Sequence, residues 1–339
     1  MIQPLYGGNT LPEPPQPELY VQKQWLTSTY TLDGRKVYGF VHNEFHGEDY
    51  PSLRAQGCLI GGGQCWWASI TTYISTDMGD TFRPIAPPPN HYLAGPWHRF
   101  EPRLPDGRVA GRVGTAGHTN VVKGHDSFYY MFTNPLSEGG KQETNDMCLL
   151  RSSDLENWYI WDGHGFARQF VDPYKRVIPE SERFCAPIDA GFRTRSVMYS
   201  PEFQTYIIVT SRNDASSSTG RSYHYATSPD LIHWSRVVWL RDMKPSESVP
   251  SVIDHTSPSR NFDTVGRNPY LYIGRDIPRG ELAGESAPTG EVWREQLTIS
   301  PRPGSTNETP YTRETALREL DRIVQLLRSL FELVPVRGY

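Results

Sequence analysis

Three turn sequences of one kind recur along the chain at a nearly constant interval. Segments 75–82, 152–158 and 228–234 each begin Ser-x-Asp, and each has an aromatic residue four or five positions after the aspartate. Their aspartates are separated by 77 and then 76 residues. A repeat of this length predicts duplicated structural units. Because each copy follows a strand-like run, we expect the blades of a β-propeller.

The residue types explain why such a turn ends a strand. A serine and an aspartate can satisfy the free backbone N–H groups of a tight turn, while the aromatic side chain packs between neighbouring sheets. The first copy reads S-x-D-x-G-x-T-F in full, and the other two keep S-x-D-L-x-x-W. Asp77, Asp154 and Asp230 are therefore predicted to be structural.

Aromatic and β-branched runs mark strands that accompany these turns. They occupy residues 37–41, 128–132 and 206–209, and a fourth run, 270–273, has no clear turn of this type. We expect four blades from these runs, over residues 20–85, 116–165, 194–241 and 249–300. A fifth blade would be completed by residues near one terminus or by 101–113. The predicted fold is thus all-β, a five-bladed β-propeller domain over residues 1–300.

The composition changes after residue 300. Thr309 and Pro310 suit the start of a helix, and an apolar stripe at helical spacing follows. The stripe consists of Leu317, Leu320, Val324, Leu327 and Phe331. We predict a C-terminal α-helix over about 311–333 within a segment 301–339. Packing on the propeller wall is favoured, and a role as a dimer or partner helix stays open.

Charge and hydropathy exclude some classes of partner. The 38 acidic and 34 basic residues give a net charge of −4, which favours neither nucleic acid nor an anionic membrane. No run of 18 apolar residues exists, and the first nine residues lack the features of a signal peptide. We expect a soluble chain, while a removed leader, the cellular location and the oligomeric state stay open.

Four cysteines are too few for a disulfide scaffold, and none of their spacings matches a C-x-x-C zinc pair. Cys58 and Cys65 could form a bridge in an oxidising compartment. We favour unpaired, packed thiols.

The three turns resemble the Asp boxes of the sialidase-like and the five-bladed furanosidase-like glycoside hydrolases. The resemblance covers roughly residues 20–300. It implies a sugar pocket on the propeller axis with catalytic carboxylates around it. Because Asp boxes also occur in propellers that only bind, it is more specific for the fold than for the reaction.

Blade topology narrows the search for a site. Loops between the second and third strands, and the segments leading into first strands, lie at one end, here called the top. The top should carry Glu44 and His46 in the polar run 42–49, because acids and imidazoles there are useful in a pocket and costly in a core. Other candidates at the top are His118, Asn120, Asp189, Arg193, Arg195, Arg212, Asp214, Glu247, Arg275 and Asp276.

Glycoside hydrolysis usually needs two carboxyl groups, and we expect them among Glu44, Asp189 and Glu247. His46, His118, Asn120, Arg193, Arg195, Arg212, Asp214 and Arg275 are predicted to contact substrate. Trp66, Trp67 and Trp97 could stack on sugar rings, although packing in the wall is favoured. We expect a glycoside hydrolase that acts on a carbohydrate in the axial funnel.

Three alternatives remain. A sialidase would need several arginines that converge on a carboxylate. A lectin-like propeller would bind sugar without a catalytic pair, and an interaction scaffold would present an apolar patch. No metal site is predicted from spacing and no cofactor is required; a structural cation on the axis is conceivable, with His118 as its one candidate ligand.

Overall fold

The computed structural model describes residues 13–61, 63–136, 147–179, 182, 185–188, 196–276 and 290–300. Within these ranges the regular secondary structure is nearly all β-strand, with one four-residue helix, α1 (Pro51–Arg54), and two short 3-10 turns, η1 (Pro17–Leu19) and η2 (Gly47–Asp49). The strands are β1 (Lys23–Thr31), β2 (Val37–His46), β3 (Trp66–Ser75), β4 (Arg83–Pro84), β5 (Tyr92–Ala94), β6 (Arg112–His118), β7 (Val122–Lys123), β8 (Tyr129–Leu136), β9 (Cys148–Ser152), β10 (Trp158–Ile160), β11 (Ser196–Ser200), β12 (Thr205–Asn213), β13 (Arg221–Ser228), β14 (Val238–Asp242), β15 (Glu247–Ile253), β16 (Tyr270–Asp276) and β17 (Gly290–Gln296).

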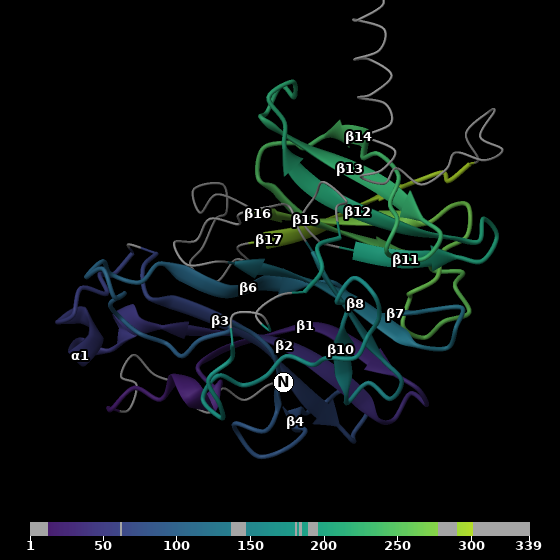
Figure 1. Cartoon of the computed structure of the whole chain (residues 1–339). Coiled ribbons are helices and arrows are strands. Elements are labelled where there is room, and N and C mark those ends of the chain that lie inside the picture. The colour runs from purple at the N-terminus through teal and green to yellow at the C-terminus, as the bar shows by residue number, and fades with distance from the viewer. Residues whose placement is uncertain are drawn as a thin grey trace, which may run out of the picture.

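These strands form four blades of a β-propeller (Figure 1). Blade 1 contains β1, β2 and β3, with β4 and β5 on its outer edge, and blade 2 contains β7 to β10. Strand β6 pairs in parallel with β3 and antiparallel with β8, so blades 1 and 2 join in one ten-stranded sheet. Blade 3 is the four-stranded sheet β11 to β14, and blade 4 is the three-stranded sheet β15 to β17.

The described residues form four blades, not the expected five. Segment 101–113 was one candidate for the missing blade, but it holds only a bridge between Arg103 and Val109 and then enters β6. Its backbone is used to connect blades 1 and 2, which leaves no separate sheet there. The predicted helix over 311–333, and the segment 301–339 that contains it, lie outside the described residues.

Apolar side chains fill the spaces between successive blades. One cluster joins Phe40 of blade 1 to Met131 of blade 2, and a second joins Phe132 of blade 2 to Ile208 of blade 3. A third cluster lies between blades 3 and 4. Strand alternation explains this arrangement, because successive side chains of a central strand point toward opposite neighbouring blades.

Loops at the end opposite the top bring blade 4 against blade 1. The Asn261 side chain donates to the carbonyl of Thr31 (2.9 Å) and accepts from its N–H (2.8 Å). The Tyr30 hydroxyl donates to Asp263 over 3.1 Å. The two ends of the described ring are thus held together by polar contacts.

The three Ser-x-Asp turns share one structure. In each, the serine hydroxyl lies within hydrogen-bonding distance of its aspartate, and following backbone N–H groups donate to both side chains. The residue after the aspartate has a positive φ in every copy, at 64°, 69° and 68°. Trp158 and Trp234 are buried, and their indole N–H groups donate to carbonyls of their own turns.

Replacing the serine of one turn should have a measurable cost. The Ser152 hydroxyl is buried and accepts from the N–H groups of Asp154 (3.2 Å) and Leu155 (2.8 Å). Ser152→Ala leaves these donors unsatisfied, so we expect the free energy of unfolding to fall by about 1–3 kcal/mol. Ser153→Ala is the matched control, because the neighbouring Ser153 is exposed. Urea unfolding that shows equal stability for the two variants would contradict this role for the turn.

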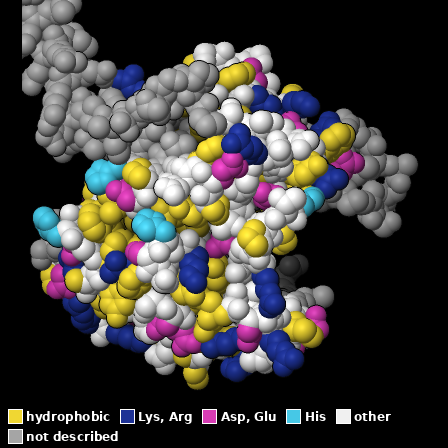
Figure 2. Space-filling view, turned by 90° about the vertical axis from the view of Figure 1, so that its right-hand side faces the viewer, with side chains coloured by type: hydrophobic (Ala, Val, Ile, Leu, Met, Phe, Trp, Pro, Cys, Tyr) yellow, Lys and Arg dark blue, Asp and Glu magenta, His cyan; other side chains and the backbone are white. Residues whose placement is uncertain are grey.

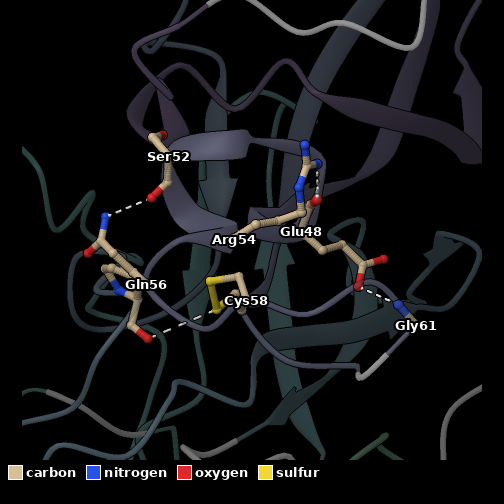
Figure 3. Close-up of a disulfide and its surroundings, with 8 residues drawn as sticks. Glu48, Ser52, Arg54, Gln56, Cys58 and Gly61 are labelled. Carbon is tan, nitrogen blue, oxygen red and sulfur yellow. Dashed lines mark hydrogen bonds between the residues drawn. A yellow bond between two sulfur atoms is a disulfide. The ribbon is translucent and has the colours of Figure 1, made fainter.

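The expectation of unpaired thiols is wrong. Cys58 pairs with Cys65, and Cys148 pairs with Cys185; the Cα atoms are 5.6 Å apart in both disulfides. In the first, residues 47–65 turn back after β2 so that two cysteines seven positions apart meet. The second bridges 37 positions, a pairing that only the tertiary structure brings about. Figure 3 shows the first disulfide beside α1 and the loop that carries Gly61.

Candidate functional site

Three polar side chains alternate along the upper end of β2. His42, Glu44 and His46 occupy every second position, so they share one face of the strand. The Nε2 atom of His42 lies 2.9 Å from Oε1 of Glu44, and the Nε2 atom of His46 lies 2.7 Å from Oε2. Lower on the same face, Phe40 packs against blade 2. We call these three residues the β2 triad.

The environment of Glu44 keeps its carboxyl group ionised. Burial alone raises the pKa of this carboxyl, but hydrogen bonds from His42, His46 and Trp66 outweigh burial and hold the pKa well below its usual range. At neutral pH Glu44 is therefore an acceptor, a base or a nucleophile. This environment does not favour a role as proton donor.

Aromatic rings flank the triad. The ring of His42 has its centroid 6.2 Å from that of Trp25 and 6.0 Å from that of Trp66. Trp25, on β1, is 46% exposed and offers a flat apolar surface beside His42. Trp25 is not among the site residues predicted from the sequence; its pairing with His42 on the neighbouring strand becomes evident only from the strand register.

His118 reaches the same region from blade 2. Its Nε2 atom lies 2.7 Å from the hydroxyl of Thr27 on β1, and its ring faces the edge of Phe40. Burial lowers the pKa of His118, and the nearby His42 lowers it further. The His118 imidazole thus lies close to the β2 triad, in a setting that favours its neutral form.

A second carboxylate lies on the other side of His46. The Nδ1 atom of His46 is 3.8 Å from Glu48, while its Nε2 atom faces Glu44. The other oxygen of Glu48 accepts from the N–H of Gly61 over 3.0 Å (Figure 3). The loop closed by the Cys58–Cys65 disulfide therefore helps to hold Glu48 beside the triad.

Glu247 lies elsewhere, in an ion pair between blades 3 and 4. Both of its oxygens accept from the Arg241 guanidinium, over 2.8 and 3.2 Å, and one also accepts from the N–H of Lys244. Its side chain is 7% exposed. This carboxylate is bound to neighbouring groups of the fold, which is the arrangement of a structural ion pair.

Blade 3 carries a second polar cluster at its top. Asp214 accepts from the hydroxyls of Ser216 (2.6 Å) and Ser222 (2.7 Å), and these bonds lower its pKa to about 2. The buried His224 lies 3.8 Å from Asp214. Burial lowers the pKa of His224, and the charge of Arg212 lowers it further. The structure thus brings together Arg212 and Asp214, and adds His224, which the sequence analysis did not select.

The remaining predicted residues have separate settings. The Asn120 side chain exchanges two hydrogen bonds with the backbone of Val197 and so links blades 2 and 3. Arg275 is exposed; it donates to Ser246 and lies over the Trp293 ring. Asp189, Arg193 and Arg195 lie outside the described residues.

The other tryptophans considered for sugar stacking are structural. Trp67 is buried in a cluster near the first disulfide, and Trp97 stacks on Phe170 at a centroid distance of 4.5 Å. Wall packing, the favoured interpretation for both, agrees with these contacts.

The described residues show neither a metal-binding cluster nor a helix that could span a membrane. Among the residues with described positions, no group of three His, Cys, Asp or Glu could hold a metal ion. None of the helices in the described ranges is long and apolar enough to cross a membrane. Figure 2 shows a face on which acidic and basic side chains alternate without a large patch of either sign.

No family model and no curated protein sequence matches the chain. Solved structures that resemble it include an exo-beta-1,3-galactanase from Clostridium thermocellum, which is 16% identical in sequence and has a TM-score of 0.43. The alignment covers 80% of this chain and 45% of the galactanase chain. The alignment with a beta-fructofuranosidase from Bombyx mori covers 79% of this chain and 47% of that chain, at 12% sequence identity and a TM-score of 0.41. The alignment with an alpha-L-arabinofuranosidase from Fusarium graminearum covers 84% of this chain and 63% of that chain, at 11% sequence identity and a TM-score of 0.39.

The chain therefore spans less than half the length of the first two of these proteins. Because all three TM-scores lie below 0.5, the proposal that follows rests on this chain's own residues.

Proposed function

We propose that this protein is a glycoside hydrolase whose carbohydrate substrate binds at the top of the propeller, over the β2 triad. The observation that carries the proposal is the ionised Glu44, held by His42 and His46 beside the exposed ring of Trp25. A fixed carboxylate next to an aromatic platform suits a sugar, which offers hydroxyl groups on its edge and an apolar C–H face.

The charge state of Glu44 sets its role. Hydrolysis of a glycosidic bond pairs a proton donor with a base or nucleophile. Glu44 takes the second role, because its hydrogen bonds stabilise the ionised form. We assign the donor to Asp189, since Glu247, the other predicted carboxyl, is already bound by Arg241. In this mechanism His46 orients Glu44 rather than reacting with the substrate.

The three equivalent turns support the same class. Their serine and aspartate contacts agree with the Asp-box resemblance to sialidase-like and furanosidase-like hydrolases. Of the predicted arginines that would serve a sialidase, Arg193 and Arg195 lie outside the described residues, and the other two are divided between blade 3 (Arg212) and blade 4 (Arg275). Arg275 is already in contact with Ser246 and Trp293. Among the described residues, these contacts favour a neutral sugar as the substrate class.

A non-catalytic sugar-binding propeller is the second candidate, and one observation favours it. Every described carboxyl group whose pKa is shifted is shifted downward. A catalytic proton donor needs a shift in the opposite direction. If Asp189 does not supply it, binding without turnover is what these residues can do.

A paired screen separates the two candidates. Wild-type protein is incubated with aryl glycosides and neutral oligosaccharides, and product release and heat of binding are both measured. A hydrolase releases product from at least one of them, whereas binding without release indicates the second candidate. Absence of both binding and release across the panel would contradict a carbohydrate site.

Trp25 supplies the test of where the sugar binds. Trp25→Ala should raise KM or Kd by about 2–12-fold, the range for the loss of one stacking contact. Trp239→Ala is the matched control, because Trp239 is similarly exposed (56%) but lies on β14 of blade 3. Equal affinities for the two variants would place the sugar away from the β2 triad.

A further inference from the structure

One face of blade 4 is left uncovered by the described part of the chain. Val252, Leu271 and Ile273 point into the cluster shared with blade 3. Their neighbours along each strand point the other way, and Val292 (74% exposed) is among them. We call this surface the open face; it consists of Ser251, Tyr270, Tyr272, Val292 and Arg294. Val249 (49% exposed) lies at its margin, beside the register shift of β15.

The middle of the open face is a fixed aromatic and cationic platform. The ring of His255 stacks on Tyr270 at a centroid distance of 5.0 Å and lies 2.5 Å from the Tyr272 hydroxyl. The Arg294 guanidinium lies over the Tyr270 ring at 4.9 Å. The valines at its margins complete a surface that is apolar at the edge and positively charged near the centre.

Blade 4 also lacks an outer strand within the described residues. Blade 3 has four strands, whereas blade 4 has three, and β17 is at its edge. Most of the β17 side chains are exposed. Bare sheet edges promote aggregation, and proteins protect them with charged side chains, with bulges or by covering them with another element.

We propose that the C-terminal segment 301–339 of this chain covers the open face, with its predicted helix packed against Val292 and the two tyrosines. Continuity of the chain supports this occupant. After β17 the backbone still follows blade 4, because Leu297 N–H donates to Pro269 O (2.8 Å) and Ile299 N–H to Arg267 O (2.7 Å). The segment therefore starts beside the surface that it would cover.

Length and pattern agree with this placement. Ten residues separate position 300 from the predicted helix, enough to reach roughly 33 Å when extended, which exceeds the length of any strand in blade 4. The apolar stripe that includes Leu317, Leu320 and Leu327 matches an apolar surface. Asp321 lies at the margin of that stripe and has the charge opposite to that of Arg294.

The test compares pairs of matched substitutions in the full-length chain. Val292→Glu places a charge on the open face, while Val177→Glu does so at an equally exposed valine (79%) elsewhere. Leu320→Glu changes the apolar stripe, while Leu326→Glu changes the opposite side of the predicted helix. We expect Val292→Glu and Leu320→Glu each to lower Tm by about 2–8 °C, and the double variant to lose less than the sum. The controls should change Tm by less than 2 °C.

Hydrogen exchange supplies a readout that does not depend on overall stability. Leu320→Glu should raise amide exchange in 290–296 about tenfold or more, and leave exchange in β11 and β12 unchanged. The proposal is overturned if Val292→Glu matches Val177→Glu, or if Leu320→Glu matches Leu326→Glu. Sedimentation as a dimer that Val292→Glu alone dissociates would also overturn it, because the occupant would then be a second copy.

Discussion

Replacing Glu44 with glutamine is expected to lower kcat by about 10²–10⁴-fold on any substrate that the wild-type protein hydrolyses. The amide keeps the size of the side chain and can still accept one hydrogen bond, but it has no negative charge to act as base or nucleophile. KM should change far less than kcat, because Trp25 and the remaining polar groups still bind the sugar. Initial rates at saturating substrate measure the effect.

The matched control for this substitution is Glu202→Gln. Glu202 is an exposed glutamate at the opposite end of blade 3, in an ion pair with Arg267. Its replacement should leave kcat and KM unchanged. If Glu44→Gln retains more than about a tenth of the wild-type kcat while folding normally, Glu44 is not the reacting carboxylate.

The pH profile gives an independent check on Glu44. Its pKa is depressed in the folded protein, so the pairing with His42 and His46 contributes stability above the ordinary glutamate pKa of about 4.3. That contribution is lost only as the pH falls through the lower, folded-state pKa. The pH–activity profile of the wild-type protein should therefore show no loss of activity near pH 4 that is caused by protonation of Glu44. If the wild-type profile does fall near pH 4, and this fall is absent in Glu44→Asp, then Glu44 titrates normally.

Arg241→Ala is expected to give the largest loss of stability, about 3–5 kcal/mol in the free energy of unfolding. The substitution removes two of the three hydrogen bonds that the buried carboxylate of Glu247 accepts and leaves it without a counter-charge. It also removes the partner of Glu295 and the cation above the Tyr223 ring. Urea unfolding monitored by tryptophan fluorescence measures the change.

Two further variants test whether the loss of stability in Arg241→Ala comes from the unpaired charge of Glu247. Arg267→Ala breaks the exposed pair with Glu202 and should cost at most about 1 kcal/mol. Arg241→Met combined with Glu247→Met removes both charges, so the double variant should be more stable than Arg241→Ala. If the double variant is the less stable of the two, the unpaired charge is not the source of the loss.

Sequence reasoning located the blades well because their signals are local. The predicted runs 128–132, 206–209 and 270–273 coincide with β8, β12 and β16, the second strands of blades 2, 3 and 4. Strand alternation and turn residues act over a few positions, so they can be identified without knowledge of the rest of the chain. The expected fifth blade is not found among the described residues. One of its two predicted sources, segment 101–113, leads into β6, whose backbone partners are β3 and β8; the other, residues near a terminus, lies largely outside the described residues.

The candidate site divides in the same way. Glu44 and His46 lie at the upper end of β2, in a polar run that the sequence alone reveals. The contact between Thr27 and His118, by contrast, joins positions 91 residues apart, and the ring contact of Trp25 with His42 depends on the register of β1 and β2. Glu247 has the same residue type as Glu44, yet Arg241 converts it into a structural ion pair.

The sequence by itself determined the all-β class, the repeating turns and the polar upper end of β2, because each arises from interactions between residues a few positions apart. Only the tertiary structure decided the number of described blades, both disulfides and which carboxylate stays accessible. Those outcomes depend on contacts between distant segments, such as the 37-residue span from Cys148 to Cys185, and such contacts form only when whole blades have packed against one another.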